Sequence, residues 1–96
     1  MNTSEEQLAH YRAMEQGLNE LVGALTGVLS PTSIINVRLL LTAGEYGLAL
    51  EMICEAIEDQ RVPISSSQYE GIEALGQRMG MESGTWEGLG SLRRTD

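Results

Sequence analysis

Apolar residues recur at alternating intervals of three and four along residues 8–29, and this spacing is the strongest constraint on the fold. Residues three and four apart share one face of an α-helix, so we expect a long amphipathic helix that packs its stripe against a core. Thr3 or Ser4 is the expected N-cap, with Glu5 and Glu6 favoured by the helix dipole. The stripe consists of Tyr11, Met14, Leu18, Leu21, Leu25 and Val28, widened by Leu8, Val22 and Leu29.

The end of this helix is marked by glycine, serine and proline. Gly23 and Gly27 lie four residues apart, and each lowers helix stability by ~1 kcal/mol relative to Ala, so we expect another helix to cross closely there. Ser30-Pro31 starts the next helix, because Pro fits the first helical position and Ser30 can cap it. The apolar residues of 32–41 would also fit a strand. Nothing else in the chain offers a pairing strand, so we expect a short, mostly buried helix.

A third helix is expected over residues 43–60. Thr42-Ala43-Gly44-Glu45 has the spacing of a capping box, with Thr42 as N-cap and Glu45 at the third helical position. We expect Gly47 to allow close approach of a neighbouring helix. At 100° per residue the remaining apolar residues form one core-facing side. This side holds Tyr46, Ala49, Leu50, Ile53, Ala56 and Ile57.

The opposite side of the third helix is acidic. Pairs of like charge three or four residues apart destabilise a helix by roughly 0.2–0.5 kcal/mol each, and no Lys or Arg within the helix relieves them. Three interpretations remain open: a solvated surface, a protein-binding surface, or a metal site, although carboxylates on one straight helix surround Ca²⁺ poorly. The acidic side comprises Glu51, Glu55, Glu58 and Asp59, with Leu48 among them and Met52 at the border.

Pro63 ends the third helix, and residues 65–67 are expected to be a loop. Ser67-Gln68-Tyr69-Glu70 has capping-box spacing and is expected to open a fourth helix. Ile72, Leu75 and Met79 lie on one face of it, Arg78 falls in the last turn, and Gly80 is the expected C-cap. The tail, residues 82–96, has Trp86, Leu89 and Leu92 at three-residue spacing, which fits one irregular turn packed over the core, whereas its glycines favour weak order. Trp86 there is either a packing plug or a partner contact.

Length and charge restrict the class of protein. A chain of 96 residues makes one domain, here divided into a helical part, 1–81, and the tail, 82–96. The net charge is −8, and all six cations are Arg. Such a surface repels phosphate backbones, so direct nucleic-acid binding is not expected and the natural electrostatic partner is a basic protein. No apolar run approaches the ~20 residues of a membrane span, and no signal peptide is expected.

Candidate catalytic residues are few. Cys54 has no partner for a disulfide within the chain, which favours a reducing cytoplasm, and its apolar surroundings indicate a small buried hydrophobe. His10 is the only histidine and is expected on the surface. Nucleotide-binding, zinc-protease and CxxC patterns are all missing from the sequence. We therefore expect no enzyme, no cofactor and no metal.

One stretch resembles a known family. Ala43-Gly44-Glu45-Tyr46-Gly47-Leu48-Ala49-Leu50-Glu51, the Pro63-Ile64 loop and the closing Met79-Gly80-Met81 look like the small helical MafI-type immunity proteins of bacterial polymorphic toxin and contact-dependent growth inhibition systems. The resemblance covers roughly residues 33–81. It implies a non-enzymatic antitoxin, held in the cytoplasm, that binds a cognate toxin domain, often a nuclease.

Together these patterns predict an all-α protein, a compact bundle of about four helices with an irregular C-terminal tail. The expected partner is a cognate toxin domain that is basic, such as a nuclease, and is bound through the acidic side of the third helix. Glu51, Glu55, Glu58 and Asp59 would steer association, and Leu48 and Met52 would add apolar contacts. The alternative is a small acidic interaction module without a toxin partner, homodimeric through the stripe of Tyr11–Val28.

Overall fold

The computed structural model describes residues 3–94, and these form an all-α fold without strands. The expected fold class is therefore confirmed, although the described residues form five α-helices rather than about four. The order along the chain is α1 (Thr3–Leu25), α2 (Pro31–Thr42), α3 (Tyr46–Asp59), α4 (Ser66–Arg78), the short α5 (Gly84–Glu87) and the 3₁₀-helix η1 (Gly88–Leu92).

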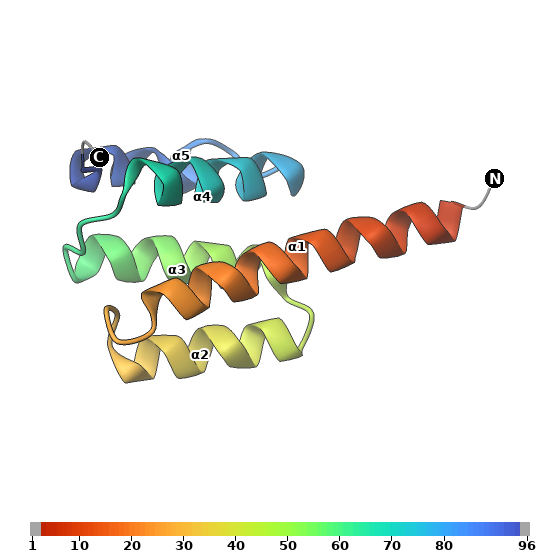
Figure 1. Cartoon of the computed structure of the whole chain (residues 1–96), viewed down its shortest axis with the longest axis horizontal. Helices are drawn as coiled ribbons and strands as arrows, with labels where there is room; N and C mark the ends of the chain where they lie inside the picture. The colour runs from red at the N-terminus through yellow and green to blue at the C-terminus, as the bar shows by residue number, and fades with distance from the viewer. Residues whose placement is uncertain (1–2, 95–96) are drawn as a thin grey trace.

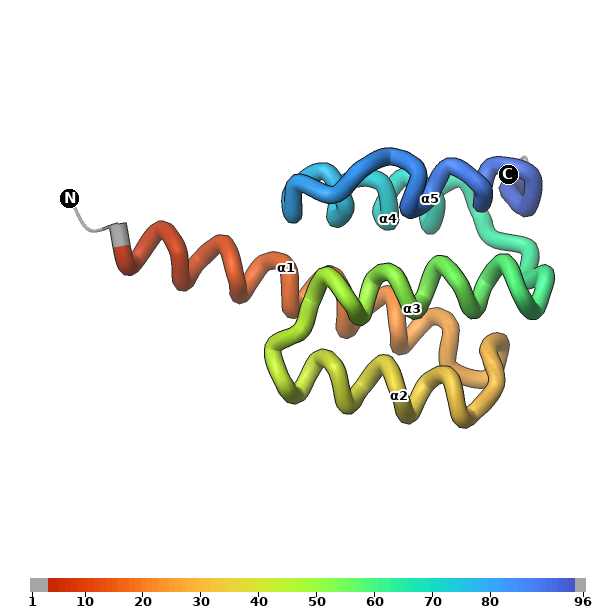
Figure 2. Tube along the Cα trace, turned by 180° about the vertical axis from the view of Figure 1, so that it is seen from behind, coloured from red at the N-terminus to blue at the C-terminus, as the bar shows by residue number. Residues whose placement is uncertain are grey.

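Helix α3 lies at the centre of the bundle and contacts every other element. Helix α2 runs along one side of it, while α4, α5 and η1 lie on the other side (Figure 1). Seen from behind, α2, α3 and α5 follow one another as three layers (Figure 2). Helix α1 crosses this arrangement and contacts α2, α3 and α4. The core is continuous through all of these elements and includes Leu18, Val37, Leu50, Ile72 and Leu89.

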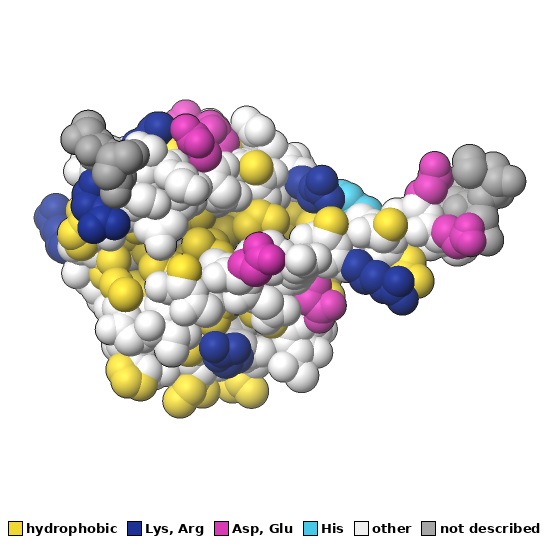
Figure 3. Space-filling view, viewed as in Figure 1, with side chains coloured by type: hydrophobic (Ala, Val, Ile, Leu, Met, Phe, Trp, Pro, Cys, Tyr) yellow, Lys and Arg dark blue, Asp and Glu magenta, His cyan; other side chains and the backbone are white. Residues whose placement is uncertain are grey.

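The N-terminal half of α1 projects from the bundle as an arm, which we define as residues 4–13 (Figure 1). The molecule is accordingly elongated, with extents of 45 × 26 × 21 Å. The stripe is buried from Met14 to Leu25, but Leu8 and Tyr11 on the arm are about half exposed. The prediction that these two pack into the core is wrong, because the helix runs past the edge of the bundle. Charged side chains of both signs cover the arm (Figure 3).

Other expectations for this region also fail. The helix begins at Thr3, so Thr3 and Ser4 lie inside it rather than before it as N-cap. Gly23 has no neighbour within 4 Å of a Cβ placed on it, and Gly27 lies in the following turn with φ +87°. Val28, in the same turn, is exposed. The close approach is instead made at Gly17, where a Cβ would lie 2.9 Å from Cδ2 of Leu75 in α4.

Helix α2 begins as predicted, with Pro31 at its first position and the Ser30 hydroxyl accepting a hydrogen bond from the Ser33 N–H, 3.2 Å. It is not mostly buried, however. Ile34, Val37 and Leu41 face the core, whereas Ile35 and Leu39 point to solvent. Because α2 is the outermost layer, only one of its faces can be covered.

The expected capping box at Thr42 is wrong. Thr42 is the last residue of α2, and its hydroxyl donates to the Arg38 carbonyl, 3.0 Å. Gly44, at φ +77°, lets its N–H reach the Leu41 carbonyl and the Glu45 N–H reach that of Leu40. This is a Schellman ending for α2, in which the left-handed residue is usually Gly. Glu45 then precedes α3 as N-cap without a side-chain capping bond.

Within α3 the expected core face is largely confirmed, since Ala49, Leu50, Ile53, Ala56 and Ile57 are buried and Tyr46 packs at the edge of the core. Cys54 is buried too, as predicted. Gly47 has no neighbour within 4 Å of a Cβ placed on it, so the expected close approach there is wrong.

The fourth helix begins two residues earlier than predicted. Ser65, not Ser67, is the N-cap, and it forms a capping box with Gln68. Ile72 is buried, Leu75 and Met79 pack against the core, and Arg78 lies in the last turn, as expected. Gly80 follows the C-cap Met79 with φ +70°.

The described part of the tail, residues 82–94, folds into α5 and η1, and both contact α3. Trp86 is only 2% exposed and Leu89 is fully buried, so Trp86 is a core residue, as in the packing-plug interpretation. Residues 95 and 96 lie outside the described residues. Backbone hydrogen bonds join Ile64 to Leu92 and Arg94, at 3.0 and 2.8 Å.

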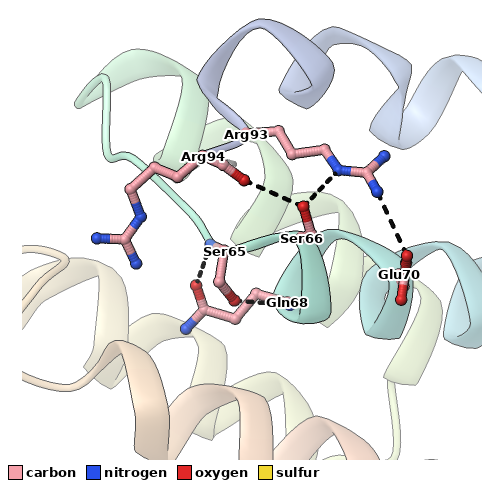
Figure 4. Close-up of polar contacts among 6 residues, drawn as sticks. All are labelled: Ser65, Ser66, Gln68, Glu70, Arg93 and Arg94. Atoms are coloured by element: carbon pink, nitrogen blue, oxygen red, sulfur yellow. Dashed lines mark hydrogen bonds and ion pairs between the residues drawn. The ribbon is translucent and has the colours of Figure 1, made fainter. Parts of the chain in front are cut away.

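Side chains fasten the end of the tail to the start of α4 (Figure 4). The Ser66 hydroxyl donates to the Arg94 carbonyl, 3.0 Å, and accepts from Nε of Arg93, 3.1 Å. The Arg93 guanidinium also pairs with Glu70, 3.3 Å, and lies 4.8 Å from the ring centre of Tyr69. The tail is thus held both by its buried side chains and by these polar contacts.

Candidate partner-binding site

The predicted acidic side of α3 is exposed, as its sequence pattern requires. Glu51, Glu55, Glu58 and Asp59 all face solvent, and Leu48 is 51% exposed among them. Met52 is only partly exposed because it packs against the core. The helix presents this side because its other apolar residues pack on the opposite side, toward the core.

A groove of about 650 Å³ runs between α3 and the connection from α4 to α5. We call it the acidic groove. Glu51, Glu55 and Glu58 line it from α3, and Gly80, Met81, Glu82, Gly84 and Thr85 line it from the connection. The groove exists because Gly80 turns the chain sharply out of α4, so that residues 81–85 pass alongside α3. Four carboxylates therefore surround one open hollow.

The groove divides the six predicted contact residues. Leu48, Met52 and Asp59 lie on α3 but do not line it, whereas Glu51, Glu55 and Glu58 do. Glu82 belongs to the groove and was missed by the sequence-based prediction. No local pattern could have identified it, because its approach to α3 depends on how the tail folds back.

Glu58 occupies a defined place at one end of the groove. A Cβ placed on Gly88, at the start of η1, would overlap Oε2 of the Glu58 side chain. The carboxylate thus lies directly over the glycine, where any larger residue would displace it. Because the carboxylate is the flexible end of an exposed side chain, Gly88 leaves room for it but does not hold it in place.

Among the described residues, the carboxylates of the acidic groove form no ion pairs. Within residues 3–94 the only ion pair is that of Arg93 with Glu70, on another surface. The four groove carboxylates therefore have no cationic partner in the described part of the chain. Burial raises the pKa of the Cys54 thiol, inside α3, from 9.0 to about 12, and repulsion from Glu58, Glu55 and Glu51 adds to this rise.

Chemically, this arrangement can attract and hold positive charge. Cys54 is buried and His10 lies on the arm, so neither lines the groove. Among the described residues, no three His, Cys, Asp or Glu side chains converge closely enough to hold a metal ion.

A second hollow, of about 410 Å³, adjoins the groove at the base of the arm, and Met81 lines both. Tyr11 and Tyr46 face one another in it with ring centres 6.5 Å apart. Met14 and Met79 complete its apolar lining. Tyr and Met are enriched at protein interfaces, where Met adapts to different partners. His10 and Glu45 also line this hollow, so a hollow of mixed aromatic, methionine and polar lining continues the charged one.

Comparison of the chain with protein-family models, with curated proteins and with solved structures found no match. Among the described helices, none has the combination of length and apolar character needed to cross a membrane.

Proposed function

We propose that this protein is an immunity protein that binds and neutralises a cognate bacterial toxin domain, without catalysing a reaction itself. The observation that carries the proposal is the acidic groove, in which Glu51, Glu55, Glu58 and Glu82 surround one hollow and form no ion pair with any cation among residues 3–94. The resemblance of residues 43–51 to MafI-type immunity proteins supplies the class of partner.

The charge arrangement favours a basic partner, such as a nuclease domain. Carboxylates with like-charged neighbours on one helix side oppose folding slightly. They become favourable when a cationic surface covers them, since opposite charges across an interface accelerate association and select the partner. A chain that only needed solubility could spread its acidic residues, and it would not need to line a hollow with them.

Apolar contacts would supply most of the affinity. Leu48 remains a candidate because it is exposed beside the carboxylates, and Met52 remains one at the margin of the core. Met81 and Tyr46 join them, because they supply apolar surface to the hollow at the base of the arm, which continues from the acidic groove. Large apolar side chains encircled by charge are typical of interface hot spots.

The test requires the toxin domain encoded beside this chain in its genome, which is expected at the C-terminus of a large secreted protein. We expect Glu51→Lys/Glu55→Lys to slow association with this domain by at least ~10-fold at low salt, because electrostatic steering is lost. Protection of cells that express the toxin should weaken in parallel. The matched control is Glu6→Lys/Glu20→Lys, which makes the same change in net charge on α1.

The two double variants separate steering by the groove from steering by net charge. If both slow association equally, the groove is not the contact surface. If neither changes association or protection, the acidic groove has no part in binding the toxin. Circular dichroism of each variant checks that the fold is intact, and all four residues are exposed.

A further inference from the structure

The acidic residues of this chain are distributed unevenly. Residues 21–44 contain no Asp or Glu and one cation, Arg38, so this segment carries a charge of +1. Since the whole chain carries −8, the remaining residues carry −9. The segment includes all of α2, which is the outermost layer of the bundle (Figure 2). This segment therefore contributes no negative charge to the surface that it forms, although Glu15 of α1 adjoins Arg38 at one flank of α2.

This surface is also apolar. Ile35 and Leu39, one helical turn apart on the outward face of α2, are 58% and 64% exposed, and Val28 in the preceding turn is 53% exposed. In the space-filling view, hydrophobic side chains project along the lower edge, where α2 lies, and no acidic side chain is visible there (Figure 3). We call Val28, Ile35 and Leu39 the α2 patch.

The α2 patch has a hollow beside it. A depression of about 330 Å³ lies at the start of α2 and is lined by Thr26, Gly27, Leu29, Pro31, Ile34 and Ile35. Leu39 lies four to eight residues further along, which corresponds to roughly 6–12 Å at the rise of an α-helix. One helix thus carries both a projecting side chain and a depression of suitable size, displaced along its axis.

We propose that the chain forms a two-fold symmetric dimer through α2. In an interface of this symmetry, residue i contacts residue j and residue j contacts residue i. If two α2 helices lie antiparallel about an axis near Asn36, Leu39 of each copy meets the depression between Pro31 and Ile35 of the other. Leu39 and the depression thus lie at positions along α2 that this symmetry pairs.

Charge identifies the second copy as the occupant. Two molecules that each carry −8 repel one another unless they meet where acidic residues are absent, and α2 is that place. A basic protein gains nothing electrostatic there and is drawn to the acidic groove instead. Because α2 and the groove lie on opposite sides of α3 (Figure 2), the dimer leaves both grooves open. The inference therefore does not depend on the proposed toxin partner.

The dimer should be weak and should respond to salt in an unusual direction. Three aliphatic side chains per copy cover much less than the ~800 Å² per partner of a standard interface, so we expect a dissociation constant of about 10–100 µM. Salt screens the repulsion between two acidic molecules but leaves apolar contact intact. Association should therefore tighten as NaCl rises, whereas binding of a basic partner weakens.

Sedimentation equilibrium of the full chain at low and high NaCl tests the proposal. Protein concentrations from about 5 to about 500 µM bracket the dissociation constant expected above. We expect a monomer–dimer equilibrium that Leu39→Glu and Ile35→Glu each abolish without changing helical content or thermal stability. The control is Leu8→Glu, which places the same charge on the exposed arm and should leave the dimer unchanged. A wild-type chain that stays monomeric throughout the range overturns the proposal, and so does a dimer that only Leu8→Glu dissociates.

Cross-linking locates the axis. Asn36 is exposed, so Asn36→Cys should form a disulfide-linked dimer under mild oxidation, whereas the buried Cys54 of the wild type should not. Adding Leu39→Glu to Asn36→Cys should prevent the cross-link, and Gln77→Cys on the exposed face of α4 should give none. Equal cross-linking at positions 36 and 77, or none at position 36, contradicts dimerisation through α2.

Discussion

The indole of Trp86 occupies the space that a side chain on Gly76 would need. A Cβ placed on Gly76 would lie 2.6 Å from Cε3 of the ring, closer than real Cβ atoms approach a neighbour. Gly76 is buried in α4, and Trp86 is the buried residue of α5. The docking of the tail on the bundle therefore depends on the lack of a side chain at position 76.

We predict that Gly76→Ala destabilises the protein by about 1–3 kcal/mol, because the added methyl forces the rigid indole out of its position in a filled core. The free energy of unfolding measured by urea titration provides the test. Trp86 is the only tryptophan, so its fluorescence reports the tail, while circular dichroism reports the helices.

Gly71 is the matched control on the same helix. It is exposed, and a Cβ placed on it meets nothing within 4 Å. Gly71→Ala should therefore stabilise the protein by about 0.5–1 kcal/mol through helix propensity alone. If Gly76→Ala proved as stable as Gly71→Ala, the close contact with Trp86 would be without consequence.

Arg61 is the one non-glycine residue with positive φ, +54°, among the described residues. It ends α3 in the way that Gly44 ends α2, with the Val62 N–H bonded to the Ile57 carbonyl, 3.0 Å. An L-residue in this conformation is strained by roughly 1–2 kcal/mol, and Gly regains part of this while losing more chain entropy. We predict that Arg61→Gly raises the free energy of unfolding by about 0.5–1 kcal/mol.

The converse change at Gly80, φ +70°, completes the comparison. Gly80→Ala should destabilise the protein by about 1 kcal/mol, because Ala does not fit the left-handed conformation. A destabilising Arg61→Gly would mean that the arginine side chain itself contributes more than its backbone strain takes away.

Removing a single groove charge should stabilise the isolated protein. Glu55 lies four residues from both Glu51 and Asp59 and three from Glu58. We predict that Glu55→Gln increases the free energy of unfolding by about 0.5–1 kcal/mol at low ionic strength, and that ~1 M salt removes the gain. Glu20→Gln, at a position without acidic neighbours three or four residues away, should change stability little. Equal effects of both substitutions would point to net charge rather than to the groove.

Cys54 gives a pH dependence whose sign follows from its raised pKa. In the unfolded chain the thiol ionises near 9.0, but in the folded protein it stays protonated until about 12. Between these values the unfolded state binds fewer protons, so stability falls as pH rises, by about 1.4 kcal/mol per pH unit. The difference between wild type and Cys54→Ala isolates this contribution, because all other groups are common to both proteins. Parallel curves above pH 9 would contradict the raised pKa.

Periodicity and capping patterns in the sequence predicted that the helices exist, but they predicted the residue at which each helix begins less reliably. Ser30-Pro31 was placed correctly because its cap needs only neighbouring residues. Ser65 and Ser67 both have the capping-box spacing, to Gln68 and Glu70, and sequence spacing does not choose between them. The choice is made by the tail, whose residues Leu92 and Arg94 hold Ile64 by its backbone just before Ser65.

Other features depend on contacts between distant segments. The periodicity of α1 indicated which side would face a core, but not that the bundle would end before Tyr11. The acidic side of α3 was visible in the sequence, whereas the groove required Glu82 from a segment that returns only through the turn at Gly80. Glycine content pointed to a loose tail, because the sequence did not reveal that the tail meets Gly76 through Trp86.

The acid-free layer formed by α2 gives the molecule an electric polarity. Near a positively charged surface, such as an anion-exchange resin, a protein with this distribution turns its acidic side toward the resin and its α2 side toward the solvent. Adsorbed molecules should therefore share one orientation, in which each exposes the same apolar layer to the solvent.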